Sequence, residues 1–379
     1  MRHIPQGLTG STSTRQNPKI STANLGESTD YRLARAGRRL GSSLTILAAE
    51  STITLSQKII IDADPGIADA LAVLVAFADP AIDVIGLTAV SGSVSGIQAT
   101  RNLHYLIGLA DPLRHPRVGQ SDSVASAAEQ STLGMPSQQS LNGRMGLGEV
   151  NPLVPDLHNR RESSKLIVEL VRAHPQEVRI VTFGPLTNLA RAFDLDPDLP
   201  LLLNGLICLG GVTRANGDVT STAEFNMWSD PLAARTVMRS PIGKIIVPLE
   251  VSNGPGLTFE GIDRLSGLIP STPVGEFVIG LLQFAVRANR QFLPREEVPI
   301  SAAAALAIAA HATKFVTETV ALDVETTGEL TAGMTIADRR PFALRQTNAE
   351  IVTQIDVPSV IDYFCRGLRR IAVSSEGHA

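Results

Sequence analysis

The chain has 379 residues, of which 44% are hydrophobic, and its formal net charge is -4 at pH 7. This length and apolar content allow one large domain or two ordinary ones, and we expect one. The dispersed Lys and Arg residues form no basic face for nucleic acid or an anionic membrane. No apolar stretch approaches the roughly twenty residues that cross a bilayer, so we expect a soluble protein that binds neither nucleic acid nor membrane.

The chain contains two cysteines, which are too few for a disulfide framework. Cys208 lies in the apolar run Leu206 to Leu209 and Cys365 in the expected C-terminal helix, so we predict that both are buried free thiols. This cysteine usage fits a reducing compartment, and we expect a cytoplasmic location.

Residues 1–56 are rich in Ser, Thr, Gly and Asn and show little hydrophobic periodicity. One interpretation is a twin-arginine signal, because Arg38 and Arg39 precede an apolar segment. That segment is short, is interrupted by polar residues and begins late for a secretory signal. We therefore favour a disordered or mis-started extension over 1–56, followed by one domain over 57–372 and a short tail over 373–379.

The most informative segment is 58–70, KIIIDADPGIADA. Its apolar start predicts a buried strand, Pro-Gly predicts a turn, and the apolar spacing that follows predicts a helix. Three carboxylates, Asp62, Asp64 and Asp69, surround the turn. At the carboxyl end of a strand they suit Ca2+ or Mg2+, and a metal-held carboxylate can act on water. The structural alternative is that Asp62 and Asp64 cap the turn while Asp69 begins the helix.

Strand and helix patterns alternate through the rest of the chain. A Pro-rich segment at 111–160 is the exception, and loops of this length are functional or mobile. The alternation predicts an α/β fold: a single large domain with a central, mostly parallel sheet flanked by helices. The expected strands are 84–90, 178–182, 206–209, 244–249 and a pair within 324–338 that turns at Gly328; the expected helices are 97–109, 163–173 and 274–292.

Segment 58–70 resembles the opening motif of the nucleoside hydrolase family, inosine/uridine-preferring type, which usually reads DxDPGxDDAxA. Further blocks occur in the family's order over about residues 57 to 370. They are TAVSGSVS (88–95), NGRMGLG (142–148), VTFGPLTNLA (181–190), GDVTSTAEFNMWSDPLAA (217–234) and VETTGELTAGMTIADRR (324–340). The resemblance implies an open Rossmann-like core, a homo-dimer or homo-tetramer, and hydrolysis of a ribonucleoside to ribose and free base by water activated on Ca2+.

The resemblance also implies roles for individual residues at the metal. Asp64 matches the metal-bound carboxylate that accepts the proton of water, and Asp69 matches a bidentate metal ligand. Asp62 matches a supporting carboxylate. The residue before Gly-Pro, whose backbone carbonyl binds the metal in the family, is Phe183 here in place of the usual Thr.

The AEFN block is intact and implies that Glu224, Phe225 and Asn226 bind the 5'-hydroxyl end of the ribose. The structural alternative is a helix N-terminus in which Asn226 or Asp230 is the cap. We favour the functional interpretation because the whole block matches.

Several positions depart from the family pattern. The second adjacent Asp of the opening motif, which holds a ribose hydroxyl, is Ala68, and the ribose-binding Asn is Ser93. Asn142 replaces the usual His of the HGxxGLG block, and Asp218 replaces an Asn. Ser93, Asn142 and Asp218 remain candidates for substrate binding. The loss at Ala68 removes a charged hydrogen bond worth about 1.5 to 3 kcal/mol.

The most important departure concerns the His-Asp pair ahead of the last large helix, which corresponds to Ser301 and Ala302. A candidate proton donor and a metal-ligating carboxylate are therefore missing. The loss weakens Ca2+ binding, because affinity follows ligand charge, and Ser301 cannot act as an imidazole-like acid. Water and Glu297 are the candidates for the vacant coordination position, but we favour a solvated loop pair for Glu296 and Glu297.

Two hypotheses follow from these departures. The first is a Ca2+-dependent N-glycosidase with altered or reduced activity on a nucleoside or related ribosyl compound. The second is a catalytically impaired family member that binds a nucleoside or ribose. The retained acidic residues favour the first hypothesis, and the missing His-Asp pair favours the second.

The sequence carries no clear signature of base preference. We expect segment 111–160 and the helix 274–292 to surround the leaving base. The candidates there are Asn142, Met145, Phe284, Arg287 and Asn289.

Overall fold

The structure is a computed structural model. It describes residues 56–121, 123, 136–154, 160–293, 295–341 and 345–374, all of which belong to the second of two compact units, 53–379. Apart from Ser56, the predicted N-terminal extension lies outside the described residues, as does segment 375–379 of the predicted tail.

The strands build one large sheet and one small one. The strands of the large sheet are β1 (Gln57–Ala63), β2 (Ile82–Ala89), β3 (Arg117–Gly119), β4 (Arg179–Thr182), β5 (Gly205–Leu209), β6 (Lys244–Val247), β9 (Phe315–Val324), β10 (Thr335–Asp338) and β11 (Ala349–Ile355). Their order is β10-β9-β11-β6-β5-β4-β1-β2-β3. The pairs from β3 to β11 are parallel, and β9 and β10 add an antiparallel edge. A separate antiparallel pair joins β7 (Gly256–Thr258) to β8 (Glu297–Pro299).

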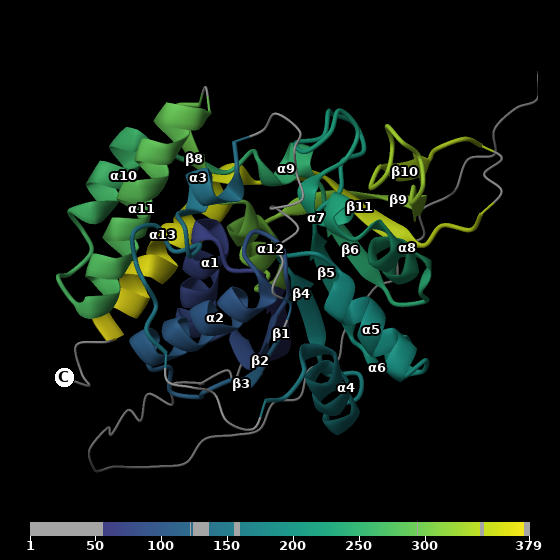
Figure 1. Cartoon of the computed structure of the whole chain (residues 1–379), viewed down its shortest axis with the longest axis horizontal. Helices are drawn as coiled ribbons and strands as arrows, with labels where there is room; N and C mark the ends of the chain where they lie inside the picture. The colour runs from purple at the N-terminus through teal and green to yellow at the C-terminus, as the bar shows by residue number, and fades with distance from the viewer. Residues whose placement is uncertain are drawn as a thin grey trace, which may run out of the picture. The chain divides into compact units, whose positions relative to one another are not determined.

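Helices cover both faces of the large sheet, as Figure 1 shows. On one face, α1 (Ile67–Ala78), α2 (Gly96–Ala110) and α12 (Ser301–Ala309) contact the sheet. Three further helices of the same core pack on these helices or on one another: α10 (Phe259–Ser266), α11 (Pro273–Phe292) and α13 (Val357–Ser374). The other face packs against α4 (Ser163–Ala173), α5 (Thr187–Leu195), α6 (Leu199–Leu202) and α8 (Pro231–Arg239). Short helices are α3 (Gln138–Asn142), α7 (Phe225–Ser229) and α9 (Leu249–Ser252).

The apolar run in β1 explains this layering. Ile59 and Ile61 lie in the core on one face of the sheet, while Ile60 lies in the core on the other, and all three are fully buried. Alternate strand residues point to opposite faces, so a continuous apolar run requires cover on both. The predicted α/β fold with a mostly parallel sheet is confirmed.

The strand order places a reversal of winding beside β1. The chain proceeds outward through β1, β2 and β3, then returns to the other side of β1 and proceeds through β4, β5 and β6. In open α/β sheets the carboxyl ends of the strands at such a reversal form a crevice that binds ligands.

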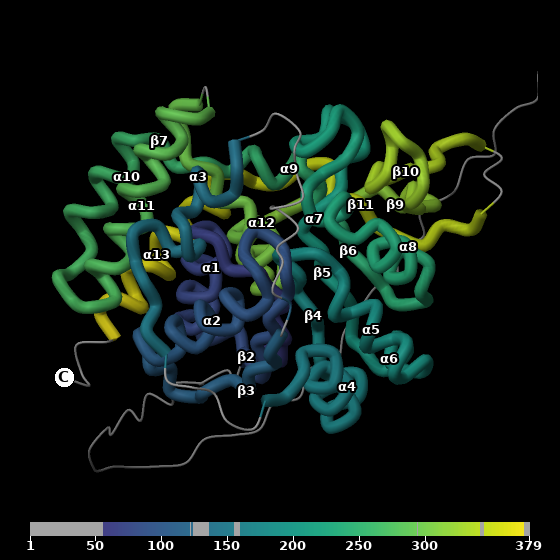
Figure 2. Tube along the Cα trace, in the orientation of Figure 1, coloured from purple at the N-terminus to yellow at the C-terminus, as the bar shows by residue number. Residues whose placement is uncertain are grey.

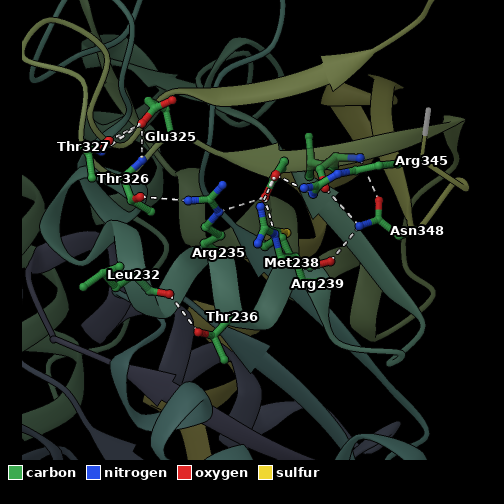
Figure 3. Close-up of polar contacts among 12 residues, drawn as sticks. Leu232, Arg235, Thr236, Met238, Arg239, Glu325, Thr326, Thr327, Arg345 and Asn348 are labelled. Carbon is green, nitrogen blue, oxygen red and sulfur yellow. Dashed lines mark hydrogen bonds and ion pairs between the residues drawn. The ribbon is translucent and has the colours of Figure 1, made fainter. Parts of the chain in front are cut away.

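A polar network fastens the antiparallel edge to the parallel core (Figure 3). On β9, Asp323 accepts hydrogen bonds from Arg239 of α8, the shorter at 2.7 Å, and from Arg345 at 2.5 Å. Asn348 donates through Nδ2 to the carbonyl oxygen of Met238 at 2.8 Å. None of these residues lines the cavity described below, so we assign the network a structural role.

Most predicted elements are present, with shifts at their ends. The predicted helix 163–173 coincides with α4, whereas the predicted strand 244–249 ends at Val247, because Leu249 already begins α9. The turn at Gly328 is present between β9 and β10, and α13 runs to Ser374, past the predicted boundary at 372. Cys208 is a buried free thiol as predicted, but Cys365 is only partly buried.

Candidate functional site

A cavity lies at the carboxyl ends of β1 and β4, the strands at which the winding reverses. Asp64 directly follows β1, and Phe183 directly follows β4. Segments far apart in the sequence meet here because parallel strands end on one side of the sheet. The sequence-predicted residues that line the cavity are Asp64, Ala68, Asp69, Ser93, Asn142, Phe183, Asp218, Glu224, Phe225, Asn226 and Ser301.

The Asp64 carboxylate is held tightly in one position. A Cβ atom on Gly92 would lie 2.1 Å from its Oδ2, and one on Gly184 would lie 2.2 Å from its Oδ1, so only glycine fits on either side. The backbone N–H of Ser93 donates to Oδ2. Burial raises the pKa of Asp64 to about 6, and the hydrogen bonds from Ser93 oppose this rise. Gly92 of the SGS segment and Gly184 of the FGP segment therefore leave the space that the Asp64 carboxylate occupies.

Asp62 lies behind Asp64 and does not line the cavity. It is fully buried and accepts hydrogen bonds from Thr88 Oγ1 at 2.5 Å and from Asn188 Nδ2 at 2.8 Å. Burial raises its pKa to about 7, although both hydrogen bonds act in the opposite direction. This position suits a supporting role for Asp62, which contacts Thr88 and Asn188 and does not line the cavity.

Asp69 lies in the first turn of α1 and completes an acidic pair with Asp64. Its pKa is raised well above the ordinary value, first by burial and then by the negative charge of Asp64. A cation between the two carboxylates would relieve this repulsion. The described residues contain no group of three or more His, Cys, Asp or Glu side chains arranged around a metal position. The donors present are two carboxylates and the Phe183 carbonyl, which fit a hard cation that keeps several water ligands.

Glu224 and Asn226 line the cavity at the start of α7. The Glu224 carboxylate accepts hydrogen bonds from the backbone N–H groups of Gly211, Asn226 and Met227, the shortest at 2.8 Å. Glu224 is the cap of α7. Of the two caps in the structural alternative, Asp230 is confirmed as the cap of the next helix, α8, whereas Asn226 caps neither helix. Glu224 therefore both caps α7 and lines the cavity.

The Asn226 amide has a fixed orientation. Its Nδ2 donates to the carbonyl oxygens of Phe183 at 2.7 Å and Leu209 at 3.0 Å. Both amide protons are therefore in use, and Oδ1 is the atom that this side chain offers to a ligand. The same contacts join the predicted sugar end of the cavity to the Phe183 carbonyl at the predicted metal position.

Asp218 adds a second carboxyl group near Glu224. Its Oδ1 is buried and has no hydrogen-bond partner within the described part of the chain. Burial raises the pKa of Asp218 to about 6. Burial also raises the pKa of Glu224, to about 8, and the negative charge of Asp218 adds to this rise. The two groups therefore disfavour each other's ionised form.

Replacing Asp218 with Asn is expected to make the stability of the metal-free protein less dependent on pH. Carboxyl groups with raised folded-state pKa values hold protons that the unfolded chain has released, so stability falls as pH rises from about 4 toward about 8. Asp218→Asn removes one such group and the charge that raises the pKa of Glu224. Thermal unfolding midpoints measured in a chelator from about pH 5 to about pH 8 test this. Equal slopes in the variant and wild-type proteins would contradict it.

The positions where the sequence departs from the family pattern have different surroundings. Ala68 and Ser301 line the cavity, whereas Ala302 is fully buried in α12 and does not line it. Among the described residues that line the cavity there is no His, Lys, Arg, Cys or Tyr. Glu297 is exposed on β8 and does not line the cavity either.

Of the side chains expected around the leaving base, Asn142 and Asn289 line the cavity. Met145, Phe284 and Arg287 do not, and Arg287 pairs with Glu149 at 2.6 Å. Three further polar residues line the cavity but lie in no recognised sequence block and were not predicted: Gln138, Ser252 and Asn253. For Gln138 there is one local pattern in the sequence: Ser137 is a typical helix N-cap and precedes the short helix 138–142.

The nine-stranded sheet, the winding reversal and an acidic cavity at that reversal define the chain as an α/β enzyme. The family model described as inosine-uridine preferring nucleoside hydrolase matches residues 59–362. The chain therefore belongs to this family, whose members are hydrolases acting on N-glycosyl compounds.

Individual relatives agree with the family match. An inosine-uridine preferring nucleoside hydrolase of Crithidia fasciculata is 27% identical over 321 residues, which are 84% of this chain and 99% of the relative. A probable uridine nucleosidase 2 of Arabidopsis thaliana is 35% identical over 215 residues, which are 55% of this chain and 64% of that relative. The solved structure of a plant nucleoside hydrolase matches with a TM-score of 0.73 and 25% identity, covering 83% of this chain and 99% of that one.

Within the described residues, no helix is both long and apolar enough to span a membrane.

Proposed function

We propose that this protein hydrolyses the N-glycosidic bond of a ribonucleoside to ribose and free base, using water activated on a divalent cation, Ca2+, with altered or reduced activity. The observation that carries the proposal is that Asp64, Asp69, Glu224 and Asn226 line one cavity at the winding reversal of the sheet. The buried carboxyl group of Asp64 and the partly buried one of Asp69, both with raised pKa values, lie at one end and suit a cation. Polar groups with fixed orientations lie at the other end and suit a sugar.

The chain's own residues have distinct parts in this mechanism. Asp64, Asp69 and the Phe183 carbonyl would hold the cation, which when bound lowers the pKa of a coordinated water. Asp64 would accept a proton from the water that attacks the anomeric carbon. Its fixed position between two glycines keeps the carboxylate aligned for this transfer. Glu224 and Asn226 hold the sugar hydroxyls.

Among its described lining residues, the cavity lacks an imidazole that could protonate the leaving base. The described lining residues include no side chain that titrates as an imidazole does, because Ser301 stands where the family has His. Ala302 contributes no carboxylate to the cation. These two positions support a reduced rate, and they also support the second candidate function, binding of a nucleoside or ribose without turnover.

Release of ribose from a panel of purine and pyrimidine ribonucleosides separates the two functions. We expect release that depends on calcium, with kcat below the median of about 10 per second for enzymes. A chelator should abolish it, which excludes a contaminating metal-independent hydrolase. Ribose release no faster than in a protein-free control, together with saturable binding of a nucleoside, would favour the binding function.

We also propose a cytoplasmic homo-dimer or homo-tetramer. Two cysteines without a disulfide bond support a reducing location. The family resemblance supports the oligomeric state. Light scattering of the full chain tests this, and a monomer at micromolar concentration would contradict it.

A further inference from the structure

We infer that Gln138 and Asn289 bind the leaving base, and that Gln138 stabilises the negative charge that the base acquires as its bond to ribose breaks. The inference rests on the proposed hydrolysis and supplies the group that acts on the leaving base. Gln138 lies on α3 and Asn289 on α11, and the two helices pack against each other, as Figure 2 shows. Both side chains line the cavity.

A chain of hydrogen bonds determines which atom Gln138 presents. The backbone N–H of Ile67 can only donate, and it donates to Oδ1 of Asn142 at 3.0 Å. The Asn142 amide must therefore turn its Nδ2 toward Gln138, where it donates to Oε1 at 2.8 Å. Nε2 of Gln138 is the free end and makes no hydrogen bond to any residue that the structure describes. Asn142 is thus a positioning residue, and Gln138 is held as a donor.

Asn289 presents the opposite polarity. It is only 7% exposed, and its Nδ2 donates to the carbonyl oxygen of Ala285 at 2.8 Å. Its Oδ1 is buried and has no partner among the described residues. Buried acceptors are almost always paired in folded proteins, so an unpaired one beside a cavity indicates a ligand that donates to it. The end of the cavity formed by α3 and α11 therefore offers one donor and one acceptor.

These two groups match the chemistry of a lactam base. As the bond between C1' and the base nitrogen breaks, its electron pair moves into the base, and part of the charge reaches a ring carbonyl oxygen. Nε2 of Gln138 donates to that oxygen, and the adjacent ring N–H donates to Oδ1 of Asn289. The water oxygen bonds to C1', its proton goes to Asp64, and the departing base takes a proton from solvent. Bases with an N–H next to a carbonyl, such as uracil and hypoxanthine, have this edge.

The substitution Gln138→Glu tests the inference because it keeps an acceptor for Asn142 and replaces the donor with a carboxylate oxygen. We expect kcat for uridine and inosine to fall about tenfold to a hundredfold, as for the loss of one donor to a developing anion. Hydrolysis of p-nitrophenyl β-D-ribofuranoside, whose leaving group is stable without a hydrogen bond, should stay within about twofold of the wild-type rate. Asn289→Leu should raise KM for both nucleosides more than it lowers kcat.

Gln139→Glu is the matched control, because Gln139 is exposed on the same helix and does not line the cavity. It should leave both substrate classes unaffected. A Gln138→Glu variant that loses activity equally on the nucleosides and on the nitrophenyl riboside, or on neither, overturns the inference while the proposed function stands. A wild-type protein that hydrolyses neither substrate class overturns the proposed function itself, and the inference with it.

Discussion

An Asp64→Asn variant is expected to hydrolyse ribonucleosides about a thousandfold more slowly than the wild-type protein, a loss in the range typical for removal of a general base. The amide has the same shape as the carboxylate, so it still fits between Gly92 and Gly184 and still accepts from the backbone N–H of Ser93. What it lacks is the negative charge that binds the cation and accepts the proton of water. Initial rates of ribose release at saturating calcium measure the loss.

The matched control is Asp194→Asn, since Asp194 is exposed on α5 and does not line the cavity. Its activity should equal that of the wild-type protein. We do not expect the Asp64 variant to lose activity by unfolding. Burial raises the pKa of Asp64 to about 6, so at neutral pH the metal-free wild-type protein contains a destabilising buried charge, which the substitution removes. The thermal midpoint of the variant in a chelator should equal or exceed the wild-type value. Activity within tenfold of wild type would exclude Asp64 as the base.

The sequence predicts the parallel part of the fold well, because both faces of that sheet are covered. Runs such as 206–209 are apolar throughout, and the helix 163–173 has one apolar stripe, so each pattern has a single interpretation. The antiparallel edge is harder. The first half of β9 gives a poor strand pattern, because Thr317 and Glu318 are polar and Val316 is exposed, so only the end of β9 near Val324 was predicted. An edge strand that is half-solvated gives a weak pattern.

The site divides in the same way. Residues such as Asp64 and Glu224 belong to blocks whose glycines and caps require them, so the pattern around each one is readable. Gln138 belongs to no block, and its role depends on a hydrogen-bond direction set by Ile67 through Asn142, which are far apart in sequence. Likewise, no pattern shows that Ala302 faces the core. Contacts between distant segments decide these positions, and single-sequence patterns do not contain them.

Calcium is expected to raise the thermal midpoint of the wild-type protein, because a ligand that binds only the folded state stabilises it. With only two carboxylates, we expect a dissociation constant on the order of 0.1 to 1 mM, the range of weak calcium sites. At about 10 mM calcium this corresponds to about 1.4 to 2.7 kcal/mol of stabilisation. The cation competes with protons for Asp64, whose pKa is about 6 without metal, so the shift should be larger at about pH 8 than at about pH 5.

Asp69→Asn isolates the contribution of the second carboxylate. The variant loses the repulsion that raises the pKa of Asp69 without metal, so its midpoint in a chelator should not fall, yet calcium should no longer raise it. Asp194→Asn, again the exposed control, should keep the full calcium shift. A full shift in the Asp69 variant would exclude Asp69 as a ligand. A wild-type protein that calcium does not stabilise at either pH would remove the cation from the mechanism, since Asp64 and Asp69 would then have no shared ligand to explain their proximity.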